Sequence, residues 1–280
     1  MEETAQRFYE LFKGSSRAHG TFEVNDTKDI KQKGIGKTIR SGGAESKHWA
    51  GHLGGEYGLG VIPINEDNKV CWGCIDVDVY PLEFKHLIGL IENLKFPLVV
   101  CRSKSGGAHI FLFTKDFVSA GEMQDVLREL SAALGYGGVE IFPKQREILV
   151  DRSDVGSWLN MPYFGGEDST RYGYNKEAQN LSPEAFLEYV EKKKVSKEQL
   201  LSIKIPKAEE LTGGPPCLKV LLKQGFPEGT RNNGLFNIGV YLKKAFPEKW
   251  ETKLEEYNRK YVKPPLPAKE VLALIQQHKK

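Results

Sequence analysis

The chain has 280 residues, of which 28% are charged and 40% are hydrophobic, and its formal net charge at pH 7 is +3. This length suits one large domain or two, and so small a net charge does not by itself indicate nucleic-acid binding. The four cysteines suggest no disulfide framework. With no signal peptide or apolar run of membrane length, we expect a cytoplasmic protein with no membrane partner.

The first 70 residues are predicted to begin with a helix over Glu2–Phe12 and to contain a strand around residues 59–64. Between them, residues 28–47 are rich in lysine and glycine and poor in acids. Such a segment can follow a phosphate backbone, and Lys37 and Arg40 are our candidates for contacts with a template. An ordinary solvated loop explains the same composition equally well.

Two aspartates one residue apart are the most informative feature. Asp76 and Asp78 lie in a segment that reads as a strand, and alternate residues of a strand point to the same face. One face of this strand is then apolar, whereas the other carries two carboxylates. Like charges this close repel each other unless cations bridge them. A solvated edge strand is the alternative interpretation.

From Gly73 to Phe142 the chain is predicted to form one β-α-β-β-α-β unit, the ferredoxin-like or RRM-like arrangement. Apolar residues at helical spacing predict the two helices, and glycine-bearing segments predict the turns. The expected elements are strands over 73–79, 98–101 and 108–113, a strand beginning at 139, and helices over 82–94 and from the N-cap Ser119 to residue 134.

In that fold the first strand lies between the third and the fourth. Asp76 and Asp78 on the first strand, His109 on the third and Glu140 on the fourth are therefore expected to converge on one open face. Three carboxylates are suitable ligands for two Mg²⁺ or Mn²⁺ ions, which support nucleotidyl transfer. The turn at residues 102–107 supplies a cation, hydroxyl groups and bare backbone N–H groups, which a triphosphate requires.

Two other patterns are weaker as metal sites. Cys71 and Cys74 form a CxxC pair, but the remaining cysteines lie far away in the sequence, so we expect buried cysteines and no zinc. His48 and His52 have the spacing of helical metal ligands, but the glycines around them argue against a stable helix and no third ligand is evident.

The C-terminal part is predicted to be helical. Ser182 is expected to cap a helix over residues 183–193. A Gly- and Pro-rich linker over residues 212–216 then precedes a block of helical periodicity from Cys217 to the end. The segment Glu228–Asn233 precedes one of its helices, and a capping turn is the preferred explanation for it.

Three ordered motifs resemble those of the archaeo-eukaryotic primase superfamily. They are Asp76-Val-Asp78, the segment from Ser105 to His109, and Val139-Glu140. The likeness is greatest to the primase-polymerases of mobile elements, phages and CRISPR-associated loci. Those proteins also show segments similar to Glu140–Gln145 and, in degenerate form, Ser157–Tyr163. The resemblance covers about residues 50–175.

The resemblance implies a role for each matching residue. Asp76, Asp78 and Glu140 would hold two catalytic Mg²⁺ or Mn²⁺ ions, and His109 would contact the phosphates of the incoming nucleotide. Further nucleotide contacts are expected from Lys104, Ser105, Lys144, Arg146, Tyr80 and Asn160, with Ser103 as an alternative to Ser105. Arg231 is a third candidate for template contact, because Glu228–Asn233 is similar to a segment of the helical domain that follows such primases.

The predicted fold class is α+β, with an RRM-like core packed on an N-terminal α/β module and followed by a small all-helical domain. The expected divisions are a catalytic domain over 1–207, a linker over 208–216 and a helical domain over 217–280. The predicted function is synthesis of nucleic acid on single-stranded DNA from NTPs or dNTPs, with a helicase or CRISPR adaptation proteins as possible partners. The alternatives are a primer-dependent repair polymerase, a relaxase, and a non-catalytic RRM-like module that would use Phe111 and Phe113.

Overall fold

The computed structural model of the chain describes residues 2–22, 36–203, 218, 220, 221, 224–227 and 229–279. Lys28, Lys31 and Lys33 of the predicted basic segment, and the predicted linker at 208–216, lie outside the described residues. Two compact units divide the chain. The first contains residues 1–78, 95–127 and 140–203, and the second contains residues 79–94, 128–139 and 204–280.

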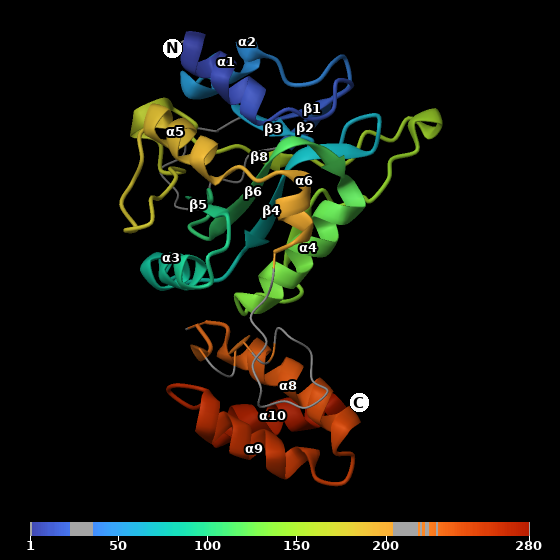
Figure 1. Cartoon of the computed structure of the whole chain (residues 1–280), viewed down its shortest axis with the longest axis vertical. Helices are drawn as coiled ribbons and strands as arrows, with labels where there is room; N and C mark the ends of the chain where they lie inside the picture. The colour runs from blue at the N-terminus through green and yellow to red at the C-terminus, as the bar shows by residue number, and fades with distance from the viewer. Residues whose placement is uncertain are drawn as a thin grey trace. The chain divides into compact units, whose positions relative to one another are not determined.

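The secondary structure alternates strands and helices up to residue 203 and is helical near the C-terminus (Figure 1). The helices are α1 (Glu2–Leu11), α2 (Ser46–Leu53), α3 (Phe84–Asn93), α4 (Ala120–Ala133), α5 (Pro183–Lys193), α6 (Lys197–Leu201), α8 (Arg231–Ala245), α9 (Trp250–Tyr261) and α10 (Ala268–Lys279), with 3₁₀ turns η1 (Val150–Arg152) and η2 (Gly166–Asp168). The strands are β1 (His19–Phe22), β2 (Gly36–Ile39), β3 (Gly58–Val61), β4 (Lys69–Val77), β5 (Leu98–Arg102), β6 (Ala108–Ser119), β7 (Glu140–Phe142) and β8 (Leu159–Asn160).

The predicted β-α-β-β-α-β unit is confirmed as β4-α3-β5-β6-α4-β7. Its four strands form an antiparallel sheet in the order β5-β6-β4-β7, so β4, the first strand of the unit, lies between the third and the fourth. Two strands are longer than expected, because β4 begins at Lys69 and β6 continues to Ser119. The boundaries elsewhere fall within a few residues of the predicted ones.

One face of this sheet packs on the first half of α4. Gly73 leaves room for that helix, because a Cβ at this position would lie 2.7 Å from Leu127 and 2.8 Å from Met123. Glycine within a strand is typical of places where another element approaches the backbone closely. The apolar face predicted from the alternation of Ile75 and Val77 is therefore present, and both residues are fully buried.

The opposite face is only partly open, in contrast to the prediction. Phe111 and Phe113 are 0% and 1% exposed, and Phe12, directly after α1, makes edge contacts with both rings at 5.4 Å between centroids. These aromatic residues belong to a hydrophobic core that also contains residues of α1, α2, β3 and α5. They cannot serve as the exposed base-binding surface that a non-catalytic RRM-like module would need.

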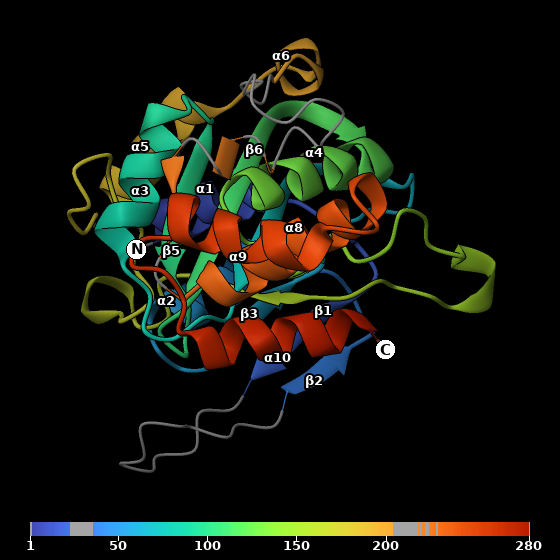
Figure 2. The same ribbon diagram turned by 90° about the horizontal axis from the view of Figure 1, so that it is seen from below.

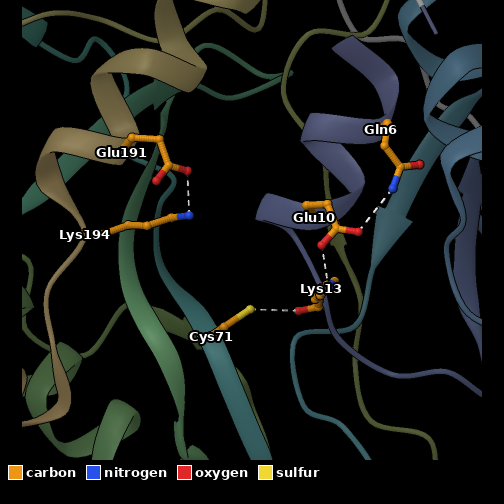
Figure 3. Close-up of polar contacts among 6 residues, drawn as sticks. All are labelled: Gln6, Glu10, Lys13, Cys71, Glu191 and Lys194. Carbon is orange, nitrogen blue, oxygen red and sulfur yellow. Dashed lines mark hydrogen bonds and ion pairs between the residues drawn. The ribbon is translucent and has the colours of Figure 1, made fainter. Parts of the chain in front are cut away.

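The junction between α1 and β4 shows how the CxxC cysteines are used (Figure 3). The thiol of Cys71 donates to the backbone carbonyl of Lys13 at 3.4 Å, and the ammonium of Lys13 pairs with Glu10. Burial raises the pKa of Cys71 to about 11, and Cys74 is fully buried. Both residues are free thiols. Cys74 fills the core between helix and sheet as buried cysteines commonly do, and the half-buried Cys71 packs against that core.

A second antiparallel sheet, in the order β2-β1-β3-β8, belongs to the same unit, and its first three strands lie side by side in both views (Figure 1, Figure 2). Leu59, Val61 and Leu159 point from one face of it into the shared core. Because side chains alternate, Gly20, Gly60 and their neighbours in register lie on the other face.

The expectation that glycines prevent a helix around His48 and His52 is wrong. α2 contains both residues, and it begins with a capping box in which the side chains of Glu45 and His48 each accept from the other residue's backbone N–H. Tertiary contacts then stabilise it, because Trp49 is fully buried against Phe8 and Phe12. His52 is also buried: its Nε2 donates to the carbonyl of Pro162 at 2.8 Å, and its Nδ1 accepts from Leu59 N at 2.9 Å.

The second unit contains the C-terminal helices α8, α9 and α10, as predicted. Leu235, Leu242, Leu254 and Leu274 are among the residues that form its own hydrophobic core. Across the part of the chain that the structure describes, none of the helices is long and apolar enough to cross a membrane.

Candidate reaction centre

The strand register places the acidic and histidine residues in one row. Asp76 of β4 is the direct cross-strand partner of both His109 in β6 and Glu140 in β7, and direct partners project to the same face. Cys101 of β5 extends the row beyond His109. The structure therefore brings together three of the four residues that were predicted to converge.

Asp78 joins this group from the end of β4. It lies two residues beyond Asp76, and its Oδ1 accepts a hydrogen bond of 3.4 Å from the hydroxyl of Ser105. Burial raises the pKa of Asp76 to about 7, and repulsion from Asp78 and then from Glu140 adds to this effect. The carboxylates are thus close enough to oppose one another's ionisation.

The described residues contain no three His, Cys, Asp or Glu side chains grouped so that they could hold a metal ion. The ammonium of Lys144 lies 2.8 Å from Oε2 of Glu140 and balances part of the negative charge. The donor set nevertheless suits a hard divalent cation, because it consists of carboxylate oxygens whose mutual repulsion a cation would relieve. Metal binding by Asp76, Asp78 and Glu140 stays a prediction.

His109 is a neutral imidazole at physiological pH. It is 8% exposed, and burial lowers its pKa to about 4 despite the attraction of Asp78. Its Nε2 lies 3.5 Å from Oδ1 of Asp76, so the contact is between a neutral ring and a carboxyl group. A neutral imidazole keeps one N–H group, which can donate a hydrogen bond to a phosphate oxygen.

The turn between β5 and β6 is tightly folded beside this row. Ser103 N donates to the carbonyl of Gly107 at 2.8 Å, and Gly106 N donates to the carbonyl of Ser103 at 3.1 Å. Gly107 permits close approach to β4, since a Cβ there would lie 2.2 Å from the carbonyl oxygen of Val77. Ser103 is buried and Ser105 is exposed, so Ser105 is the hydroxyl that a ligand can reach.

Arg171 is a buried cation that was not predicted from the sequence. Its side chain is 5% exposed, and its Nη1 has no hydrogen-bond partner. Among the described residues no carboxylate pairs with it. Its guanidinium carbon lies 5.2 Å from the centre of the Phe164 ring. Burial lowers its pKa from 12.5 to about 10, so it remains charged at pH 7.

The backbone places Arg171 beside the turn. Arg102 N donates to the carbonyl of Tyr172 and Tyr174 N donates to that of Val100, both at 2.9 Å, so this segment runs along the edge of β5. The charge of Arg171 contributes to the lowered pKa of His109 and, after burial, to the lowered pKa of Lys104. Three groups suited to phosphate therefore lie within electrostatic reach of one another. Position 171 lies in an irregular segment, where no periodicity signals it.

The other predicted nucleotide-binding residues are more scattered. The ammonium of Lys104 lies 3.4 Å from the ring centroid of Phe22 in β1. Arg146 forms a two-armed ion pair with Asp125, and packs over Gly121 at the start of α4 rather than on the row. Asn160 of β8 pairs in register with Gly60.

The remaining candidates lie away from the row or in the other unit. Lys37 and Arg40 are exposed in and just after β2, and Arg40 donates to the carbonyl of Ser153 at 2.8 Å. Tyr80 belongs to the second unit and is 52% exposed. Arg231 is the first residue of α8 in that unit, where it donates to the carbonyl of Pro264 at 2.8 Å.

The fold and the row define an α+β protein of the archaeo-eukaryotic primase type. Residues 31–201 match the family described as "TOTE conflict system, Archaeo-Eukaryotic Primase domain". The match covers more than half of the chain and includes the whole row, so this protein belongs to the archaeo-eukaryotic primase family. A search of the curated proteins found no match. The family is one of enzymes that synthesise nucleic acid.

Proposed function

We propose that this protein is a template-directed nucleotidyltransferase that starts and extends chains on single-stranded DNA. The observation that carries the proposal is the row of His109, Asp76 and Glu140 across three strands, in a chain that belongs to this family. In the reaction the 3′-oxygen of the growing chain, or of a first nucleotide, forms a bond to the α-phosphorus of a nucleoside triphosphate. The bond between the α- and β-phosphates breaks, and pyrophosphate leaves.

In this proposal the carboxylates bind metal ions and the basic groups bind the phosphates of the nucleotide. Asp76, Asp78 and Glu140 would hold Mg²⁺ or Mn²⁺, which supplies Lewis acidity to the attacking hydroxyl and neutralises charge on the leaving group. The ion pair of Glu140 with Lys144 is exposed to solvent and is therefore weak enough to exchange when a ligand binds.

The phosphate-binding side consists of His109, Lys104, Ser105 and Arg171. The neutral His109 can donate a hydrogen bond without repelling bound metal cations, and Arg171 offers a charge that has no counter-ion in the described structure. Electrostatic stabilisation by preorganised groups of this kind is strongest where water is excluded. Burial of both side chains, at 8% and 5% exposure, meets that condition.

The test is incorporation of labelled nucleotides on a single-stranded DNA template, with Mg²⁺ or Mn²⁺, with and without a primer. Product without primer would support priming, and separate NTP and dNTP reactions would define the sugar preference. Product only with a primer would reduce the proposal to a repair-type polymerase. Template binding without any product would contradict it.

A further inference from the structure

Three adjacent strands of the β2-β1-β3-β8 sheet each have a glycine where the indole ring of Trp158 lies on the sheet. A Cβ at Gly20, Gly60 or Gly36 would lie 2.3 Å, 2.4 Å or 2.8 Å from atoms of the Trp158 ring. Gly60 meets the Cε3 side of the ring and Gly36 meets the Cη2 side, with Gly20 between them. The ring therefore lies flat across β3, β1 and β2, and we call these glycines the glycine floor.

Glycine weakens a strand and commonly marks a place where another group approaches the backbone closely. Here the group that approaches the backbone is the Trp158 ring, which is not part of the hydrophobic core. Trp158 is half-buried, whereas the other three tryptophans, Trp49, Trp72 and Trp250, are buried. Its Nε1 donates to the hydroxyl of Thr38 at 3.1 Å, which fixes the ring in its plane. Because the inner face rests on the glycine floor, the accessible surface belongs to the outer face and edge.

The same face of the sheet adjoins the phosphate-binding turn. Phe22 lies two residues beyond Gly20 in β1, so it shares the face of the glycine floor, and the ammonium of Lys104 lies 3.4 Å from its ring centroid. Asn160, the cross-strand partner of Gly60, also projects to this face. Its Oδ1 is buried and has no hydrogen-bond partner within the described residues. An unpartnered buried acceptor is costly unless a water molecule, an ion or a ligand satisfies it.

We propose that the outer face of Trp158 is a stacking platform for one nucleobase of the single-stranded DNA template, with Asn160 as a hydrogen-bond acceptor at its edge. A flat, oriented aromatic ring binds bases by stacking, and unpaired bases are the ones that can reach it. The exposed Arg40 directly follows β2, one of the three strands under the platform, and its guanidinium suits the phosphate backbone. This inference rests on the proposed function, since it names where the template is held.

The experiment measures binding of a fluorescently labelled single-stranded DNA by anisotropy, without nucleotide or divalent cation. Trp158→Phe keeps an aromatic face and is expected to bind nearly as tightly as the wild type. Trp158→Leu keeps apolar cover over the glycine floor but cannot stack, and it should bind roughly 10-fold more weakly or worse. Intrinsic fluorescence should be quenched by DNA in the wild type and much less in Trp158→Phe, since the other tryptophans are buried.

A single-stranded oligonucleotide of the same length made of abasic residues is the control ligand, because it has the phosphate backbone but no bases. It should bind the wild type more weakly than normal DNA, and it should bind Trp158→Leu with little further loss, because the stack is missing in both cases. Equal binding of normal DNA by the wild type and a folded Trp158→Leu would overturn the proposal. If Trp158→Leu fails to fold, absence of quenching and of discrimination against abasic DNA in the wild type would overturn it instead.

The test of the stacking platform can fail or succeed independently of the test of nucleotidyl transfer. Base-dependent binding with quenching, but no synthesis, would keep the platform and reject the nucleotidyltransferase. Synthesis by Trp158→Leu with an unchanged KM for template would reject the platform alone. A raised KM for the incoming nucleotide, with template affinity intact, would assign the platform to the nucleotide and so overturn its assignment to the template.

Discussion

Replacing Arg171 by methionine is expected to make the ligand-free protein more stable and the phosphate site weaker. The guanidinium is 5% exposed, and its Nη1 has no partner. A buried charge without a counter-ion costs free energy in the folded state. Methionine fills a similar volume and removes that cost, and it also removes one of the two cations, Arg171 and Lys104, that we expect to contact a bound phosphate.

The magnitude follows from the lowered pKa of Arg171, from 12.5 to about 10. The unfolded chain holds the proton more tightly than the folded protein does, so the cost is fully present at pH 7 and is relieved only as the pH rises above about 10. At about 1.4 kcal/mol per pKa unit, the penalty is on the order of 3 kcal/mol. Loss of the contact with Phe164 offsets about 1 kcal/mol. We expect a net gain of about 1–3 kcal/mol and a rise of several degrees in Tm.

The assay is thermal unfolding with and without tripolyphosphate, the simplest probe for a triphosphate site. The wild type should be stabilised by the probe, and Arg171→Met should start higher but gain little from it. Arg102→Met is the control, because this neighbouring arginine is only half-buried and donates to the carbonyl of Thr170. A less stable Arg171→Met that responds to tripolyphosphate as the wild type does would refute the reasoning.

Three further predictions test other parts of the account. His109→Ala should raise the KM for nucleotide and lower the rate of synthesis, because a phosphate contact is lost, and unchanged steady-state kinetics would indicate a purely structural histidine. Burial lowers the pKa of His52 to about 4, so the unfolded state binds more protons than the folded state below pH 6.5. The free energy of unfolding should therefore fall by roughly 2 kcal/mol between pH 7 and pH 5. Denaturant titrations of His52→Gln should show a shallower pH dependence. Gly20→Ala, which places a Cβ 2.3 Å from the Trp158 ring, should cost about 1–3 kcal/mol and reduce DNA-dependent fluorescence quenching; unaltered stability and quenching would contradict a close-packed floor.

The central sheet could be predicted because each of its elements carries a local signal. The alternation around Asp76, the helical spacing after Phe84 and the glycines after α4 all indicate the same topology, and the period of two places Asp76 and Asp78 on one face. The order of the strands is that of the ferredoxin-like fold, and it places the strands of His109 and Glu140 on either side of the strand of Asp76.

The parts that could not be predicted depend on contacts between distant segments. Arg171 and Trp158 lie outside any periodic element, and their surroundings come from β5 and from the strands of the second sheet. The α2 helix formed despite its glycines, because burial of Trp49 outweighs a weak local propensity. The sequence likewise gave no sign that Phe111 would be covered by Phe12, since which helix covers a sheet face is a tertiary property.

The central claim is that the carboxylate row carries out nucleotidyl transfer, and one comparison tests it most directly. Synthesis on primed single-stranded DNA with Mg²⁺ or Mn²⁺ would be measured for the wild type, for Asp76→Asn and for Asp151→Asn, which changes an exposed acid of a surface turn. Asparagine keeps the shape of the side chain but not its charge. We expect that Asp76→Asn folds normally and makes no product, whereas Asp151→Asn is as active as the wild type. Full activity of a folded Asp76→Asn would contradict it.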